Sequence, residues 1–155
     1  FLERTALCSM MGQPTTPERA VSRQASRVVR QGTDVTLVGH GAIVAMLLQA
    51  AELAATEGTS IEVVDVRSLS PVDFDPIVAS VQKTGRMVYA QEAPGFTSVG
   101  SEISATVTER AFYSLEAPVL RVSGWDVPFP PAKIEGAYLP DVDRILEAVD
   151  RSLAY

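Results

Sequence analysis

The chain has 155 residues, of which 46% are hydrophobic, and this size fits a single domain with a substantial core. Its formal net charge of −6 argues against nucleic acid as a partner, because phosphate contacts need clustered lysines and arginines. No apolar run approaches the roughly 18 residues of a membrane span, and the single cysteine excludes an intrachain disulfide, so we expect a cytoplasmic protein without a membrane anchor.

Strands alternate with helices along most of the chain. Short apolar runs predict strands at 26–30, 35–38, 61–66, 87–91 and 119–122. Helical periodicity predicts helices at 42–57, from an N-cap at Asp73 to near Gly85, from about Ser98 to Ala111, and from about Asp141 to Leu153. Strands that alternate with helices of this length indicate crossover connections, a mostly parallel sheet and the α/β class.

Two segments are predicted to connect these elements. Residues 1–21 begin with Phe1-Leu2-Glu3, which resembles the end of a strand, and continue as a linker with glycine, proline, serine and threonine. Residues 124–140 contain four prolines and cannot join the interior of a sheet. A loop of this length is usually functional, and this one carries Trp125 and Phe129.

Candidate catalytic residues are few. The turn Gly39-His40-Gly41 joins a strand to a helix, where free backbone amides can hold an anion. It lacks the third glycine of a dinucleotide fingerprint, because that position is Val44, and only Asp65 could fill the ribose-binding role. His40 is the only histidine, and its ordinary pKa near neutrality would suit a general base.

The sequence also offers few residues for hydrolase, acid–base or metal chemistry. The segment 95–100 approaches a hydrolase nucleophile motif around Ser98, but Phe96 stands where the first glycine is needed. Glu92 follows a predicted strand, at the edge where ligand sites of open sheets gather, although it could equally cap a helix or pair with an arginine. One histidine and one cysteine cannot form a transition-metal site of the usual kind, so we expect no metal site.

Taken together, eight segments resemble one known family. They are Gly32–Val38, Ile61–Pro71, Lys83–Arg86, Gln91–Pro94, Gly100–Ile103, Leu115–Val122, Asp126–Pro130 and Tyr138–Asp141. In this order they resemble the C-terminal domain of the beta subunit of thiamine diphosphate-dependent 2-oxo acid dehydrogenases. The resemblance implies a three-layer α/β/α sandwich with a five-stranded sheet, one strand of it antiparallel. It also implies that residues 1–21 end a preceding pyrimidine-binding domain and its linker, and that residues 22–155 form the transketolase-like C-terminal domain.

The resemblance implies a role in assembly. The family's cofactor-binding and proton-transfer residues lie outside this domain, so no catalytic or cofactor-binding residue is assigned here, and the chain alone is expected to be inactive and to bind neither thiamine diphosphate nor magnesium. The implied partners are an alpha subunit, a second beta subunit and the acyltransferase core through its subunit-binding domain; self-association of the fragment is also expected. The candidate interface and docking residues are Glu116, Trp125, Phe129, Asp143, Glu147, Asp150 and Tyr155.

Three questions stay open at this stage. The segments Gln91–Pro94 and Asp126–Pro130 resemble branched-chain enzymes and favour that subtype, whereas a histidine at position 40 occurs in some pyruvate enzymes. A stand-alone α/β module that binds an anion at Gly39–Gly41 is one alternative to the family interpretation. The C-terminal domain of a transketolase or a deoxyxylulose phosphate synthase is another, since these enzymes share the fold.

Overall fold

The sheet confirms the predicted α/β class. The computed structural model describes residues 24–155, so the interpretations of residues 1–3 as a strand end and of 4–21 as a linker lie outside the described part. The sheet order is β1-β3-β2-β4-β5, with β1 antiparallel to β3 and the other pairs parallel. The strands are β1 Arg27–Arg30, β2 Val35–Gly39, β3 Ile61–Asp65, β4 Met87–Pro94 and β5 Leu120–Gly124.

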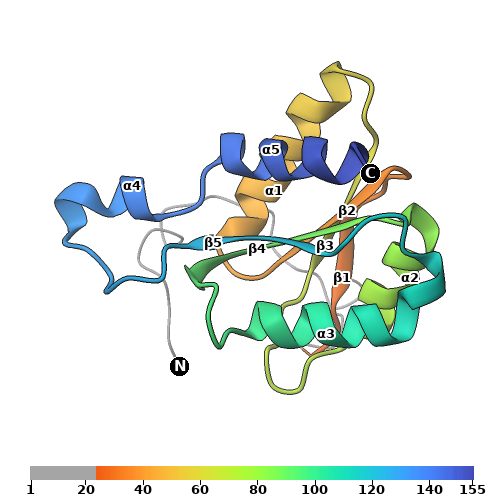
Figure 1. The fold of residues 1–155 in the computed structure, drawn as a ribbon, viewed down its shortest axis with the longest axis horizontal. Helices are drawn as coiled ribbons and strands as arrows, with labels where there is room; N and C mark the ends of the chain where they lie inside the picture. The colour runs from red at the N-terminus through yellow and green to blue at the C-terminus, as the bar shows by residue number, and fades with distance from the viewer. Residues whose placement is uncertain (1–23) are drawn as a thin grey trace, which may run out of the picture.

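Helices cover both faces of this sheet and form the expected three layers (Figure 1). One face carries α1 (Ile43–Thr56) and α5 (Val142–Leu153), and the other carries α2 (Asp75–Thr84) and α3 (Val99–Ala111). Two positive-φ glycines end helices: Gly58 follows α1 at φ +90°, and Gly85 caps α2 at φ +71°. A left-handed residue there suits glycine because it has no Cβ to clash.

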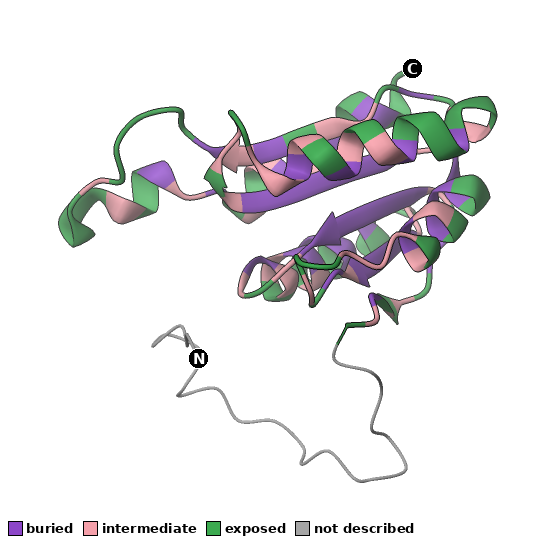
Figure 2. Cartoon of the chain, turned by 90° about the horizontal axis from the view of Figure 1, so that it is seen from below, coloured by how far each residue is buried: buried purple, intermediate pink, exposed green. Residues whose placement is uncertain are grey.

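The two halves of the core come from alternate residues of the same strands. Leu37 and Val63 pack under α1 and α5, whereas their neighbours Val38 and Val64 pack under α2 and α3. All four side chains are fully buried, and Figure 2 shows the sheet as a buried layer between the helices. The period-two geometry of a strand therefore distributes one apolar run over two cores.

One detail of the predicted helices is wrong. Asp73 is not an N-cap, because α2 begins at Asp75. Its carboxylate instead accepts a hydrogen bond from the backbone N–H of Ser26 at 3.2 Å, which ties the start of β1 to the segment before α2.

Two predicted loops contain regular structure. β4 continues past Gln91 to Pro94, and it pairs with Gly124 beyond an irregularity in the register. The Gln91 side chain supports this extension by donating from Nε2 to the carbonyl of Pro94 at 2.6 Å. The proline-rich segment between β5 and α5, residues 125–140, projects from the sandwich as an arm (Figure 1). It holds a 3-10 turn, η4 (Ala132–Ile134), and a short helix, α4 (Glu135–Tyr138).

Gly100 lets α3 approach β4 closely. A Cβ at this position would lie 2.6 Å from the Tyr89 ring and 2.7 Å from Oε1 of Gln91, closer than real Cβ contacts. The same Oε1 accepts the Gly100 backbone N–H at 3.1 Å. The glycine is therefore required by packing and not by its backbone conformation.

We expect Gly100→Ala to lower the free energy of unfolding by about 1–2 kcal/mol, because overpacking against Tyr89 outweighs the gain in helix propensity. Gly136→Ala on α4 is the matched control, since no atom lies within 4 Å of its Cβ position. Urea denaturation of both variants measures the difference. A Gly100→Ala variant as stable as the control would show that α3 shifts freely on the sheet.

Candidate functional site

His40, Asp65 and Glu92 meet at the carboxyl edge of the sheet. They belong to the ends of the neighbouring strands β2, β3 and β4, where open α/β sheets usually bind ligands. Nδ1 of His40 lies 2.9 Å from the hydroxyl of Tyr89, which is fully buried. The structure thus brings together three residues that sequence analysis considered separately, and it adds Tyr89, which sequence analysis missed because it is an ordinary core residue.

The electrostatics of this cluster disfavour charge. Burial lowers the pKa of His40 despite the nearby carboxylates of Glu92 and Asp65, and burial raises the pKa of Asp65 despite a hydrogen bond from the Arg67 backbone at 3.1 Å. Burial also raises the pKa of Tyr89, which keeps its hydroxyl protonated. Burial therefore favours the neutral form of His40 at neutral pH. The Ser98 hydroxyl bonds to the Gly95 carbonyl at 3.3 Å and lies 3.4 Å from the Ser101 hydroxyl, so the structure does not pair Ser98 with His40.

The turn Gly39-His40-Gly41 is explained by packing. A Cβ on Gly39 would lie 2.8 Å from the Ile43 side chain and 2.9 Å from that of Leu47. Gly41 has φ +66°, a backbone conformation that favours glycine. Both glycines are therefore needed to pass tightly from β2 into α1.

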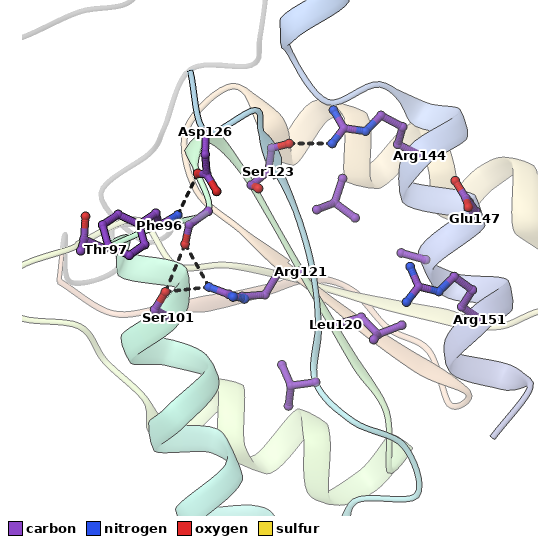
Figure 3. Close-up of a pocket in the computed structure, with 14 residues that line it drawn as sticks. Phe96, Thr97, Ser101, Leu120, Arg121, Ser123, Asp126, Arg144, Glu147 and Arg151 are labelled. Atoms are coloured by element: carbon purple, nitrogen blue, oxygen red, sulfur yellow. Dashed lines mark hydrogen bonds between the residues drawn. The ribbon is translucent and has the colours of Figure 1, made fainter. Parts of the chain in front are cut away.

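A groove runs along β5, the edge strand of the sheet. Its volume is about 870 Å³, and it lies between the first turn of α3 and one side of α5 (Figure 3). The consecutive residues Val119–Ser123 form its length. The other lining residues come from the loop after β4, from α3 and from α5: Gly95, Phe96, Thr97, Ser101, Asp126, Arg144, Glu147, Ala148 and Arg151.

The groove carries arginines on both sides. On the α3 side, Arg121 donates to the Gly95 carbonyl at 3.0 Å and to the Ser101 hydroxyl at 2.6 Å. On the α5 side, Arg144 donates to the Ser123 carbonyl at 2.7 Å, and Arg151 extends toward β5 (Figure 3). Sequence analysis missed this set, because residues 121, 144 and 151 become neighbours only when α5 packs beside β5.

The predicted acidic stripe lies on α5. Asp143, Glu147 and Asp150 lie outside the core, whereas Ile145 and Val149 are buried against the sheet. Spacings of four and three residues place the three carboxylates on one face of a helix. Glu147 also lines the groove, so the acidic stripe borders the arginines on the same helix.

An arginine that sequence analysis did not single out, Arg86, connects Glu116 to the end of α5. Arg86 forms an ion pair with Glu116, and its Nε donates to the carbonyl of Ser152 at 3.1 Å. The structure thus joins a predicted docking residue to the last turn of α5. Tyr155, three residues further on, is 69% exposed.

The two aromatic residues of the arm are partly packed. Trp125 donates from Nε1 to the Ala137 carbonyl at 3.1 Å, and the Arg144 guanidinium lies 4.7 Å from its ring centroid. The Phe129 ring meets Tyr138 edge-on with centroids 5.0 Å apart. Trp125 and Phe129 remain 55% and 60% exposed. The arm is therefore held by internal contacts while both rings stay exposed to solvent.

Within residues 24–155, no three histidine, cysteine, aspartate or glutamate side chains are placed to share a metal ion. None of the helices described there is long and apolar enough to cross a membrane.

Comparison with known proteins agrees with this architecture. Residues 24–145 match the family model for the transketolase C-terminal domain. The chain belongs to this family. A solved relative, a split gene transketolase in an inactive beta4 tetramer, superposes on this transketolase C-terminal domain with a TM-score of 0.76 at 31% identity, over 92% of this chain and 46% of that one.

The sequence of the domain is also similar to those of beta subunits of 2-oxo acid dehydrogenases. It is 64% identical over 144 residues to the pyruvate dehydrogenase E1 component subunit beta of Leifsonia xyli, covering 93% of this chain and 43% of the relative. It is 48% identical over 127 residues to the 3-methyl-2-oxobutanoate dehydrogenase subunit beta of Mycobacterium tuberculosis, covering 81% and 36%. The chain thus spans less than half the length of these relatives.

We expect His40 to titrate below its ordinary pKa of 6.5, because burial penalises the charged ring more than the nearby carboxylates favour it. The unfolded chain then binds more protons than the folded one, so the free energy of unfolding falls as the pH drops through 6.5 toward the folded pKa. As the only histidine, His40 gives one unambiguous ring signal for NMR titration. The fall in the free energy of unfolding between these pH values should be smaller in His40→Gln. A titration midpoint at or above pH 6.5 for His40 in the folded chain would contradict the burial argument.

Proposed function

We propose that this chain is the C-terminal assembly and docking domain of the beta subunit of a 2-oxo acid dehydrogenase complex. The proposed intact enzyme is a cytoplasmic oxidoreductase that decarboxylates a 2-oxo acid and transfers the acyl group to a lipoyl acceptor. The similarity to beta subunits of both pyruvate and branched-chain enzymes carries this proposal.

The substrate follows less directly from this domain. Sequence analysis favoured a branched-chain enzyme, whereas the similarity is greater to the relative named as a pyruvate enzyme. At the carboxyl edge, His40 and Tyr89 lie within hydrogen-bond distance of each other, and this pair does not distinguish one 2-oxo acid from another. We therefore propose the reaction class, a 2-oxo acid dehydrogenase, for the intact protein.

The intact enzyme would use thiamine diphosphate and magnesium, but the described residues do not fit this cofactor. A magnesium diphosphate needs oxygen ligands gathered at one place, and residues 24–155 contain no such cluster. The proposed cofactor site therefore belongs to other parts of the enzyme.

We expect the 155-residue chain to show no saturable binding of thiamine diphosphate with magnesium in titration calorimetry and no 2-oxo acid decarboxylation, because its described residues lack these ligands. Intact enzyme assembled from alpha and beta subunits is the positive control. A micromolar dissociation constant for the isolated chain would refute this assignment and would support a separate anion-binding module at Gly39–Gly41.

Assembly surfaces support the proposed partners. Trp125 and Phe129 are each more than half exposed on the braced arm, and Val127 and Ile134 beside them are equally so. Apolar clusters of this kind usually mark protein interfaces. We assign the arm to contacts with an alpha subunit or a second beta subunit, and we expect the isolated chain to self-associate through it. The solved relative forms a beta4 tetramer, which fits this expectation.

The acidic stripe supports docking of the acyltransferase core. Asp143, Glu147 and Asp150 lie on the outer side of α5, and Glu116 joins the same region through Arg86. Tyr155 adds an exposed ring beyond the helix end. A basic subunit-binding domain would meet several carboxylates here, and such an interface forms quickly and weakens with salt.

Reversing Asp143 and Asp150 to lysine should slow association of the intact enzyme with its acyltransferase core by about tenfold at low salt and flatten the salt dependence. These two residues do not line the groove beside β5, so the change tests the stripe alone. Glu102→Lys with Glu109→Lys on α3 is the matched control on the other face. Surface plasmon resonance measures the rates, and unchanged association would leave the stripe as ordinary solvated surface.

A further inference from the structure

The free edge of β5 is available for pairing. β4 lies on one side of β5, and no strand within residues 24–155 lies on the other. An edge strand presents backbone donors and acceptors that can pair with another chain. The groove follows this edge through five consecutive residues, Val119–Ser123, so its shape suits an extended segment lying beside the strand.

The groove combines an apolar floor with cationic walls. Leu120 and Val122 pack into the core under α5, and Ala148 of that helix also lines the groove. Arg121 comes from the α3 side, and Arg144 and Arg151 come from the α5 side. The lining also contains two carboxylates, Asp126 and Glu147. Asp126 already accepts the backbone N–H of Phe96 at 3.1 Å.

Arg144 is held in place before any ligand arrives. One of its terminal nitrogens donates to the Ser123 carbonyl, and its guanidinium stacks on Trp125. The other, Nη1, is buried and has no hydrogen-bond partner within the described part of the chain. A buried unpaired guanidinium nitrogen is costly, and a carboxylate would compensate that cost after a small movement of the side chain.

Charge decides which occupant fits. The chain carries a net charge of −6, yet three arginines gather at this one edge. A second copy paired edge to edge would bring both sets of arginines onto one seam, and like charges across paired strands are destabilising. A basic or neutral strand would bring no carboxylate to the positive charges of the arginines. An acidic strand would satisfy both the backbone edge and the guanidinium groups.

We propose that the groove beside β5 binds an extended acidic segment of a partner protein, which adds as a strand to the free edge. Its backbone pairs along Val119–Arg121, because Arg144 already occupies the Ser123 carbonyl. Its carboxylates bind Arg121, Arg144 and Arg151. The arginines thereby admit acidic strands and protect the edge against self-pairing. This site borders the acidic stripe on α5 and shares Glu147 with it, but it uses the arginines and the free edge of β5.

The proposal is tested with a labelled peptide of alternating valine and glutamate, about eight residues long to span the groove as a strand, titrated with the chain in a fluorescence anisotropy assay. We expect saturable binding that weakens as salt increases. The same peptide with lysine in place of glutamate should not bind. A version with N-methylated backbone amides keeps the carboxylates but cannot pair as a strand, and it should lose most of the affinity.

Two exposed arginines provide the variants. Arg121→Glu and Arg151→Glu should each weaken binding of the glutamate peptide by about tenfold or more. Arg27→Glu makes the same charge change on β1, the opposite edge strand, and should leave affinity within about twofold. Arg144 is left unchanged because its contacts with Trp125 and Ser123 also support the fold.

Three results would overturn the proposal. Equal loss of affinity in Arg27→Glu and in the groove variants would mean that only overall charge attracts the peptide. Equal binding of the N-methylated peptide would mean that the groove holds carboxylates without strand addition. Sedimentation showing a dimer of the unmodified chain that Arg121→Glu dissociates would mean that a second copy occupies the edge.

Discussion

The structure depends on β2, a strand buried on both faces and paired on both sides. All five of its residues are buried, with β3 on one side and β4 on the other, both parallel. A strand in this position needs helices over both faces, and parallel neighbours need crossover connections long enough to contain them. The three layers, the two cores and the gathering of His40, Asp65 and Glu92 at one edge all follow from this constraint.

The same constraint shapes the carboxyl edge of the sheet. The passage from β2 into α1 is so tight that a Cβ on Gly39 would clash with Ile43 and Leu47 of the helix. His40, the next residue, lies within hydrogen-bond distance of the buried Tyr89. Burial lowers the pKa of His40, which keeps it neutral, and raises the pKa of Asp65, which makes it harder to ionise. The polar pair of His40 and Tyr89 thus packs against the core at the edge where open α/β sheets usually bind ligands, and most charged side chains lie on the outer surfaces.

Those surfaces are organised around α5. Its inner face completes the core over β2, β4 and β5, which fixes the helix relative to the free edge of the sheet. Its outer face then presents carboxylates in one stripe and arginines beside β5. Arg86 and Arg144 anchor the two ends of the helix through backbone carbonyls of Ser152 and Ser123, so both charged surfaces are held on a rigid element.

Most of the fold was predictable from periodicity, because burial imposes a period of two on strands and of 3.6 on helices. The runs around Leu37, Val63 and Val88 predicted buried strands, and the stripe Asp143, Glu147 and Asp150 predicted an outward helix face. The predictions failed where a side chain forms its hydrogen bond with a partner that the local pattern does not indicate. Asp73 looked like a cap but bonds Ser26, and the loop after Gln91 is an extension of β4 that this side chain supports.

The sequence by itself determined the layers, the strand and helix positions and the acidic face of α5, since each depends on residues a few positions apart. Only the tertiary structure decided the pairing of His40 with Tyr89, the ion pair of Arg86 with Glu116 and the arginine groove beside β5. These features join residues 49 positions apart for His40 and Tyr89, 30 apart for Arg86 and Glu116, and 21 apart for Arg144 and Ser123. Their geometry follows from how α5 and the loops pack on the sheet, which no local pattern encodes.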